Sequence, residues 1–278
     1  MSTLRQTLAV VGDVPSLMLM EAAWTGMRTE DDFQSATRLP LTTVRSRLDA
    51  LTAAGLLTGD GDGRWRVTPA GMDFYSVAVV MLGWETRWNE QSPAARVKLR
   101  HQPCNRILTP RLVGPEAPTS ADDEAPAPFP RRRLSRDSVD VPRGDAIVHG
   151  SVRVLGDRWA GLILWALRHE DQRFGELKRR LTIASNILTE RLQWLTGADI
   201  LTRAHASSHA PYILTAKGRG FLDILDMVES WGAAWLEDGV ARHRPHKSRR
   251  QVLCAHCGLK VAAQDVSLEI PPRRLALG

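Results

Sequence analysis

Residues 174–203 read FGELKRRLTIASNILTERLQWLTGADILTR, and this stretch decides the fold. Apolar side chains recur every three or four residues over 174–181 and again over 185–198, which predicts two short amphipathic helices. The connection Thr182-Ile-Ala184 is so short that the two helices must meet at a steep angle, as in a helix-turn-helix. Ser185 is the expected N-cap of the second helix.

The flanking segments complete the pattern of a winged helix. Upstream, apolar stripes that include Val152, Trp159 and Ile163 predict further helices. Downstream, two short apolar segments enclose the polar loop 204–210, which is typical of a β-hairpin. A long helix is expected from about residue 215 to 236. Helices, a recognition-type helix, a hairpin and a closing helix in this order predict a winged helix-turn-helix.

The same landmarks occur once more in the first third of the chain. Three pairs correspond: Val154-Leu-Gly-Asp157 with Val10-Val-Gly-Asp13, Thr215-Ala-Lys-Gly218 with Thr68-Pro-Ala-Gly71, and Trp231-x-x-x-Trp235 with Trp84-x-x-x-Trp88. The offset is 144 residues up to the recognition-type helix and 147 after it. A constant offset that changes once predicts a duplicated domain with a shorter loop in the first copy.

We therefore expect a mainly α protein with small β-hairpins (α+β), built from two tandem winged helix-turn-helix domains with zinc-ribbon-like tails. In chain order, the expected parts are a degenerate winged-helix domain at 1–92, a basic ribbon-like remnant at 93–114, a proline-rich flexible linker at 115–145, a second winged-helix domain at 146–238, and a basic tail with a Cys-x-x-Cys motif at 239–278. Proline stiffens the linker towards an extended path, which leaves enough reach for the two copies to lie side by side.

Charge supports nucleic-acid binding only weakly. The net charge is +6, but the basic excess lies in 93–114 and 241–278, whereas the two repeated domains are acidic and neutral. Solvated basic tails explain the same excess. We find no apolar run of membrane-spanning length and no leader pattern, so we expect a cytoplasmic protein with no membrane partner.

Several landmarks of the second copy, in this order along the chain, resemble those of the HxlR-type winged-helix transcriptional regulators. They are Gly156-Asp-Arg-Trp159, Arg173-Phe-x-Glu-Leu177, Ile187-Leu-Thr-Glu-Arg-Leu192, Tyr212-x-Leu-Thr215, Lys217-Gly218 and Trp231-Gly232. The similarity covers about 90 residues of the second copy well, and the first copy more loosely. It implies a regulator of the broader MarR-like kind that binds double-stranded DNA. Such relatives normally form homodimers through their terminal helices, so this chain is either a monomeric pseudo-dimer or an ordinary homodimer.

The helix at 185–198 has the size that fits the major groove of DNA, where outward side chains near its N-terminus meet base edges. Asn186 and Gln193 suit adenine, Thr189 suits a thymine methyl group or a phosphate, and Arg191 suits guanine or a phosphate. The candidate DNA-binding residues of the second copy are Arg173, Lys178, Arg179, Ser185, Asn186, Thr189, Glu190, Arg191, Gln193, Arg203 and His205. A solvated helix face, or ion pairing of Arg191 on the protein itself, is the alternative.

The first copy keeps fewer of these features. Thr42, Arg45 and Arg47 are expected on the outer surface of its recognition-type helix. Its hairpin tip, Gly59-Asp-Gly-Asp-Gly63, and the acidic run Glu30-Asp-Asp32 would repel phosphates. We therefore expect this half to bind DNA weakly, or to act as a geometric partner.

Cysteine and histidine pairs follow each copy. Cys254 and Cys257 form a Cys-x-x-Cys pair, and His243 and His246 lie shortly before it. The pattern resembles the small ribbon that trails some HxlR-like proteins and holds zinc with four ligands. Two sets remain open: His243 and His246 with the two cysteines, or His101 and Cys104 joining them across the copies. The other alternative is a decayed ribbon without metal.

Regulation by a small-molecule effector is a further expectation. Ser2 and Ala146 occupy the places where some relatives carry a sensing cysteine, so thiol sensing has no residue there. Many tryptophans could line an effector pocket or serve in packing: Trp24, Trp84, Trp88, Trp159, Trp165, Trp194, Trp231 and Trp235. Neither a Gly-rich phosphate loop nor a Gly-x-Ser-x-Gly motif occurs, so we expect no enzyme. A winged-helix interaction or ligand-sensing module that has lost operator binding is the rival reading.

Overall fold

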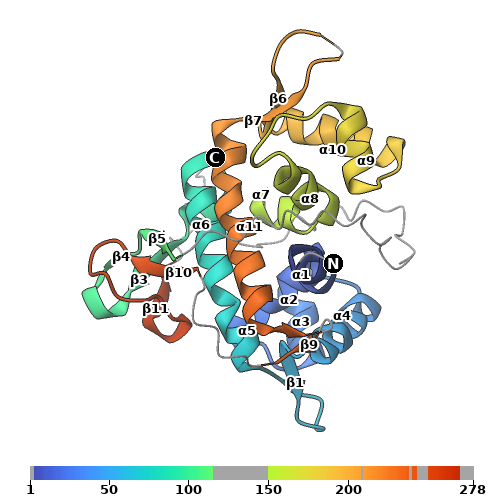
Figure 1. Ribbon diagram of the computed structural model, residues 1–278. Helices are drawn as coiled ribbons and strands as arrows, with labels where there is room; N and C mark the ends of the chain where they lie inside the picture. Colours follow the sequence, from blue (N-terminus) through green and yellow to red (C-terminus); the bar gives the residue numbers. More distant parts are fainter. Residues whose placement is uncertain (1–2, 115–149, 208, 238–239, 243–249, 270–278) are drawn as a thin grey trace, which may run out of the picture.

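The computed structural model describes residues 3–114, 150–207, 209–237, 240–242 and 250–269 (Figure 1). The expected linker at 115–145 lies outside the described residues. Within the described ranges, no helix is long and apolar enough to cross a membrane.

The first half is a helical unit with one hairpin. Its elements are α1 (Thr3–Val11), α2 (Val14–Trp24), α3 (Glu30–Thr37), α4 (Leu41–Ala53), β1 (Leu57–Gly59), β2 (Trp65–Val67), α5 (Pro69–Asp73) and α6 (Tyr75–Trp88). Side-chain oxygens of Asp13, Thr29 and Thr68 cap three of these helices, α2, α3 and α5. Asp13 accepts a 2.9 Å hydrogen bond from the N–H of Ser16, and Thr68 accepts one of 3.1 Å from Gly71.

The second half has the same order of main elements. They are α7 (Gly150–Leu155), α8 (Arg158–Ala166), α9 (Phe174–Leu181), α10 (Ser185–Gly197), β6 (Leu201–Arg203), β7 (Tyr212–Leu214) and α11 (Ala216–Trp235). The predicted helices at 174–181 and 185–198 are confirmed to within one residue. The N-cap prediction for Ser185 is wrong, because Ala184 holds the cap position and α10 lacks a side-chain cap.

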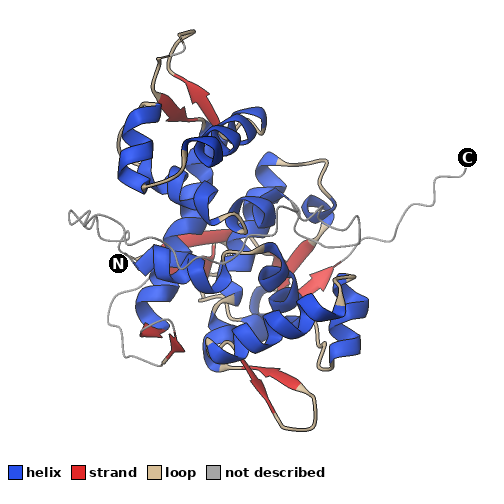
Figure 2. Ribbon diagram, turned by 90° about the vertical axis from the view of Figure 1, so that its right-hand side faces the viewer, coloured by secondary structure: helices blue, strands red, loops and turns tan. Residues whose placement is uncertain are grey.

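The two hairpins explain the change of offset between the halves. Strands β1 and β2 pair antiparallel around residues 60–64, and β6 and β7 pair around 204–211, a loop that is three residues longer. The hairpins project at opposite ends of the molecule, while α6 and α11 run side by side through its middle (Figure 1). Figure 2 shows the same two projecting hairpins after a quarter turn.

Reciprocal contacts join the halves. Trp84 Nε1 donates to the carbonyl of Lys217 at 3.1 Å, and Trp231 Nε1 donates to that of Ala70 at 3.0 Å. The rings repeat the exchange: Trp84 meets Phe221 edge-on with centroids 5.3 Å apart, and Phe74 meets Trp231 in the same way at 5.1 Å. Each contact is matched by another at an offset of 147 residues, so the two halves meet through equivalent surfaces.

The two basic segments fold together into one small β module. Strands β3 (Lys98–His101), β4 (Arg106–Ile107) and β5 (Pro110–Val113) follow the first half, and β10 (Gln251–Cys254) and β11 (Val266–Glu269) follow the second. Strand β5 pairs with β10, and β11 pairs with β3, which also pairs with β4. Short strands β8 (Leu236–Glu237) and β9 (Val240–Ala241) follow α11 and pair with each other, and the N–H of Ala241 donates to the carbonyl of Ala54 at 2.8 Å. The two basic tails, which the sequence analysis described one after the other, therefore meet, and each supplies only part of the sheets.

Candidate nucleic-acid interface and metal site

The turn between α9 and α10 orients the candidate recognition helix. Thr182 ends α9 in the left-handed region, with φ 51°, and its N–H turns back to the last carbonyls of that helix. Arg38 adopts φ 57° at the equivalent place between α3 and α4. Non-glycine residues rarely adopt this conformation, so a shared one indicates that both halves need the same sharp turn.

The outer face of α10 is polar, as predicted. Leu188, Leu192 and Leu195 are buried, which turns the opposite face to solvent. The predicted side chains that are exposed there are Ser185, Asn186, Thr189, Glu190 and Gln193. Exposed cations of the preceding segment lie close in sequence: Arg173, Lys178 and Arg179. In protein–DNA interfaces, side chains that contact base edges give specificity, and cations that contact phosphates position the protein. The amides of α10 and the cations of the segment before it have the chemistry for these two kinds of contact.

Arg191 does not belong to this face. Its Nε contacts the carboxylate of Asp157, and only 30% of the side chain is exposed. Asp157 is also the N-cap of α8, where it accepts hydrogen bonds of 3.0 and 2.9 Å from the N–H groups of Trp159 and Ala160. Ion pairing of Arg191 on the protein itself is the alternative that the sequence left open, and the structure pairs its guanidinium with Asp157 and, at 3.4 Å, with Glu190.

Arg47 repeats this arrangement in the first half. Its Nε lies 3.2 Å from the carboxylate of Asp13, the N-cap of α2, and 24% of its side chain is exposed. Arg45 points outward as expected, but it pairs with Glu30 at 2.8 Å. Thr42 is exposed. Of the three first-half candidates, Thr42 alone combines exposure with no ion pair in the described structure.

The second-half hairpin also separates structural from exposed residues. Arg203 lies over the ring of Tyr212 at 4.4 Å and donates to its hydroxyl at 2.7 Å. It donates further to the carbonyl of Ala210 at 3.1 Å, so it braces the hairpin instead of extending from it. His205 and His209 are exposed on the loop.

The first-half hairpin carries two cations that the sequence reasoning missed. Arg64 and Arg66 are exposed on either side of Trp65. The sequence Arg64-Trp-Arg66 could have indicated this, because side chains alternate between the two faces of a strand and an inward Trp65 turns both arginines outward. Asp60, by contrast, caps its own turn, accepting hydrogen bonds from the N–H groups of Asp62 and Arg64 at 3.1 and 3.2 Å. The tip is thus a mixed surface, less acidic than its Asp-Gly-Asp motif indicated.

A four-residue cluster lies in the β module. His101, Cys104, Cys254 and Cys257 each bring a ligand atom within 4.8 Å of all the others. His101 Nδ1 lies 3.4 Å from Cys104 Sγ and 3.4 Å from Cys257 Sγ, and the sulfurs of Cys104 and Cys254 are 3.8 Å apart. Two ligands come from each tail. This is the second of the two sets that the sequence left open, whereas His243 and His246 lie outside the described residues.

The Cys-x-x-Cys loop favours a thiolate at Cys254. Burial alone would raise the pKa of this thiol, but the N–H groups of Cys257 and His256 point at the sulfur, and the net pKa is lowered. His101 and Cys254 are buried, and Cys257 is exposed at the rim. A His and three Cys in this geometry form a donor set that suits tetrahedral zinc.

These features define a winged helix-turn-helix protein with an attached ribbon module. A family model described as HxlR-like helix-turn-helix matches residues 154–240. An uncharacterised HTH-type transcriptional regulator of Mycobacterium tuberculosis is 30% identical over 132 residues, which cover 44% of this chain and 84% of that relative. The chain belongs to the HxlR-like helix-turn-helix family.

Two further similar proteins are also named as transcriptional regulators or transcription factors. The HTH-type transcriptional regulator YtcD of Bacillus subtilis is 34% identical over 90 residues, covering 31% of this chain and 71% of YtcD. The solved structure of a candidate transcription factor from Pseudomonas aeruginosa is 27% identical and covers 44% of this chain and 90% of its own, with a TM-score of 0.33. That overlap is too loose to support any detail of the fold.

Proposed function

We propose that this protein is a sequence-specific, DNA-binding transcriptional regulator that reads its operator through α10. The observation that carries this proposal is the exposed row of Asn186, Thr189 and Gln193 on the outer face of a helix within the family-matched segment. Side-chain amides in this position pair with adenine in the major groove. Exposed Lys178 and Arg179 supply cations for the neighbouring phosphates of the DNA backbone.

We further propose that a single chain performs the task of a homodimer. The landmark offsets support descent from a duplicated domain, and the reciprocal tryptophan contacts have the form of an isologous interface. Asp13 and Asp157, equivalent at an offset of 144, form an antiparallel bridge with each other. Such an internal pseudo-dimer presents α4 and α10 as two recognition helices, so the operator has two unequal half-sites.

In this proposal the two halves contribute unequally to DNA binding. On α4 the one exposed arginine among the candidates, Arg45, is paired with Glu30, whereas α10 keeps its exposed amides. The first half therefore contributes position and modest backbone contact through Arg64 and Arg66. The molecular mass of the protein in solution distinguishes this monomeric pseudo-dimer from an ordinary homodimer of two chains.

Operator binding is tested by enrichment of purified protein on genomic and random DNA pools, followed by a salt titration. Asn186→Ala removes a base-reading amide without touching the core. We expect one enriched operator and a loss of specific affinity of about 1–3 kcal/mol in Asn186→Ala. Thr42→Ala, the equivalent position of α4, is the matched control and should lose much less. Arg191→Ala is unsuitable, since it breaks the ion pair with Asp157.

The neutral to acidic charge of the two halves favours one rival, a winged-helix interaction module without an operator. If no sequence is enriched and the residual binding is steeply salt-dependent and unchanged in Asn186→Ala, binding comes from the basic segments alone. That result would overturn the regulator proposal.

We also propose that the four-residue cluster binds structural zinc. Zinc–sulfur bonds of about 2.3 Å place tetrahedral ligands about 3.8 Å apart. Three pairs of ligand atoms in the cluster are 3.4, 3.4 and 3.8 Å apart, and all of them lie within 4.8 Å of one another. Bound zinc would tie together strands that are 150 residues apart in sequence. The zinc would act as a structural crosslink, because protein side chains would fill all four of its coordination positions.

A further inference from the structure

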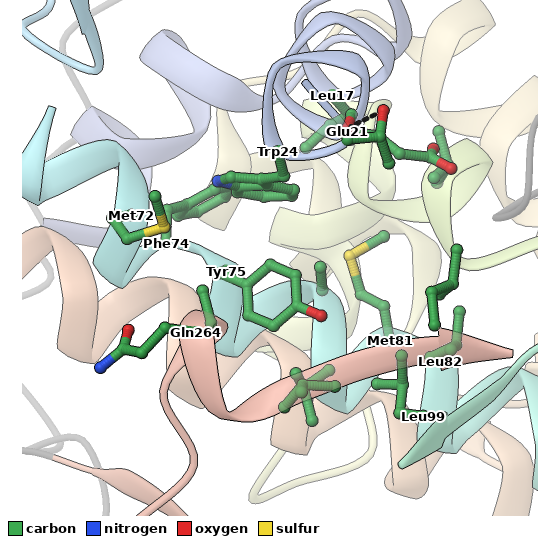
Figure 3. Close-up of a pocket in the computed structure, with 17 residues that line it drawn as sticks. Leu17, Glu21, Trp24, Met72, Phe74, Tyr75, Met81, Leu82, Leu99 and Gln264 are labelled. Atoms are coloured by element: carbon green, nitrogen blue, oxygen red, sulfur yellow. Dashed lines mark hydrogen bonds between the residues drawn. The ribbon is translucent and has the colours of Figure 1, made fainter. Parts of the chain in front are cut away.

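A cavity of about 600 Å³ lies between the first half and the ribbon module (Figure 3). Its walls come from α2, from α5 and α6, and from β3 and β11 of the ribbon, and Val152 of α7 adds a contact from the second half. Met72 and Leu268 also line it, and each is 40% exposed, so the rim of the cavity reaches the surface. The volume lies within the range of sites that hold small organic molecules.

The lining of the cavity is mostly apolar. Of the seventeen described residues that line it, fourteen are aliphatic, sulfur-containing or aromatic, and none is lysine, arginine or histidine. An anion bound here would lose its hydration without gaining a cation as a partner, which is costly. Glu21 is the one acidic residue of the lining, and it already takes part in another interaction within the protein, so it is no free partner for a cation. The cavity therefore suits a molecule without charge.

Aromatic side chains form one wall of the cavity and are fixed in place. Trp24 is held by a 3.1 Å hydrogen bond from Nε1 to the carbonyl of Gly71. Tyr75 meets it edge-on, with ring centroids 5.4 Å apart and an interplanar angle of 88°, and Phe74 lies 6.2 Å from it. Flat rings pack well against such a wall, either stacked or edge-on.

The hydroxyl of Tyr75 is the polar group that a ligand can use. Tyr75 extends into the cavity with its hydroxyl foremost (Figure 3), and this hydroxyl has no hydrogen-bond partner among the described residues. Burial raises the pKa of Tyr75, so the phenol keeps its proton and can donate it. Thr25 differs, because its hydroxyl already donates to the carbonyls of Glu21 and Ala22, at 3.2 and 2.9 Å. An oxygen atom of a ligand would satisfy a donor that the apolar wall leaves unpaired.

We propose that this cavity binds an uncharged, flat aromatic ketone of two or three fused rings. The rings pack against Trp24, and the carbonyl oxygen accepts a hydrogen bond from the hydroxyl of Tyr75. Such a ligand contacts the first half, the ribbon and α7 at once, so its binding stabilises the folded molecule. The site goes beyond the proposed DNA binding and does not depend on it.

The site is tested by equilibrium dialysis of the full chain without DNA against three probes of closely similar shape. Fluorenone is the uncharged ketone, fluorene lacks the carbonyl oxygen, and fluorenone-2-carboxylate carries a negative charge. We expect micromolar binding of fluorenone. The carboxylate should bind about tenfold more weakly or worse, because its charge has no partner in the cavity, although the chain has a net charge of +6.

Three variants locate the ligand. Tyr75→Phe removes the hydroxyl and keeps the ring, so it should weaken fluorenone binding about fivefold and leave fluorene binding unchanged. Tyr212→Phe changes the other tyrosine of the chain, which lies outside the cavity lining, and should alter neither probe. Ala78→Phe adds a ring to the cavity wall and should weaken the binding of both probes about tenfold or more.

Thermal unfolding gives an independent measurement. Fluorenone should raise the melting temperature of the parent protein and of Tyr212→Phe, but not that of Ala78→Phe. Three results would each overturn the proposal: equal binding of fluorenone and its carboxylate, an equal effect of Tyr75→Phe on fluorenone and fluorene, or undiminished binding to a folded Ala78→Phe protein.

Discussion

Arg191 lies on α10, the helix proposed to read the operator, yet its guanidinium contacts Asp157 and joins α10 to the start of α8. Arg47 and Asp13 make the same connection in the first half. At both places an aspartate serves twice, as a helix cap and as an ion-pair partner. The same ion pair in both halves indicates a structural role for these arginines, and the proposed base reading rests on the exposed amides of α10.

Arg191→Ala should lower the free energy of unfolding by about 1–3 kcal/mol, because it leaves a partly buried cap carboxylate without its cation. Denaturant titration measures the change. Arg179→Ala, on an exposed side chain of α9, should stay within about 0.5 kcal/mol of the parent. A larger effect of Arg179→Ala than of Arg191→Ala would contradict the structural role of Arg191.

At the scale of elements, α1 of the first half packs against α11 of the second. Glu229 of α11 lies in this contact, at the position equivalent to Leu82 of α6. Burial raises the pKa of Glu229 to about 7, against the opposing effects of Arg168 and the N–H of Leu4, while Asp226 raises it further. Its Oε2 is buried without a hydrogen-bond partner within the described structure. The helix contact therefore favours the protonated acid.

Stability should depend on pH through this group. The folded protein holds the proton more tightly than the unfolded chain, whose pKa is near 4.5. The free energy of unfolding should thus fall as pH rises from about 4.5 to 7, by up to about 3 kcal/mol, and level off above. Glu229→Gln should flatten this profile and be the more stable protein at pH 8, whereas Glu90→Gln, at an exposed site, should keep it. An unchanged slope in Glu229→Gln would refute the assignment.

At the scale of the whole molecule, the ribbon joins the two halves a second time. The reciprocal tryptophans hold α6 against α11, and the β module brings His101 and Cys104 close to Cys254 and Cys257. The two halves are thus connected by the tryptophan contacts and by the shared β module. Zinc bound at this cluster, as proposed above, would add a crosslink between the two halves.

Metal removal tests this second connection. Protein purified without chelator should contain about one zinc per chain by mass spectrometry. Chelation should lower the melting temperature by roughly 5 °C or more, because a crosslink between distant strands is lost. Cys104→Ser and Cys254→Ser, one ligand from each tail, should reproduce the loss and abolish zinc uptake. Equal melting with and without chelator, in protein that contains no zinc, would show that the cluster is a thiol site alone.

The sequence by itself determined the local elements and the family. The helices at 174–181 and 185–198 and the outward amides of α10 follow from periodicity, which depends on neighbours a few residues away. The offset of 144 and 147 residues even located the longer hairpin loop. Local pattern also identified the cysteine pair, but it left two ligand sets open.

Only the tertiary structure decided which distant residues meet. It turned Arg191 and Arg47 towards aspartates, paired β5 with β10, and brought His101 and Cys104 to Cys254 and Cys257. These outcomes depend on packing between segments about 150 residues apart, and periodicity along the chain carries no information about such contacts.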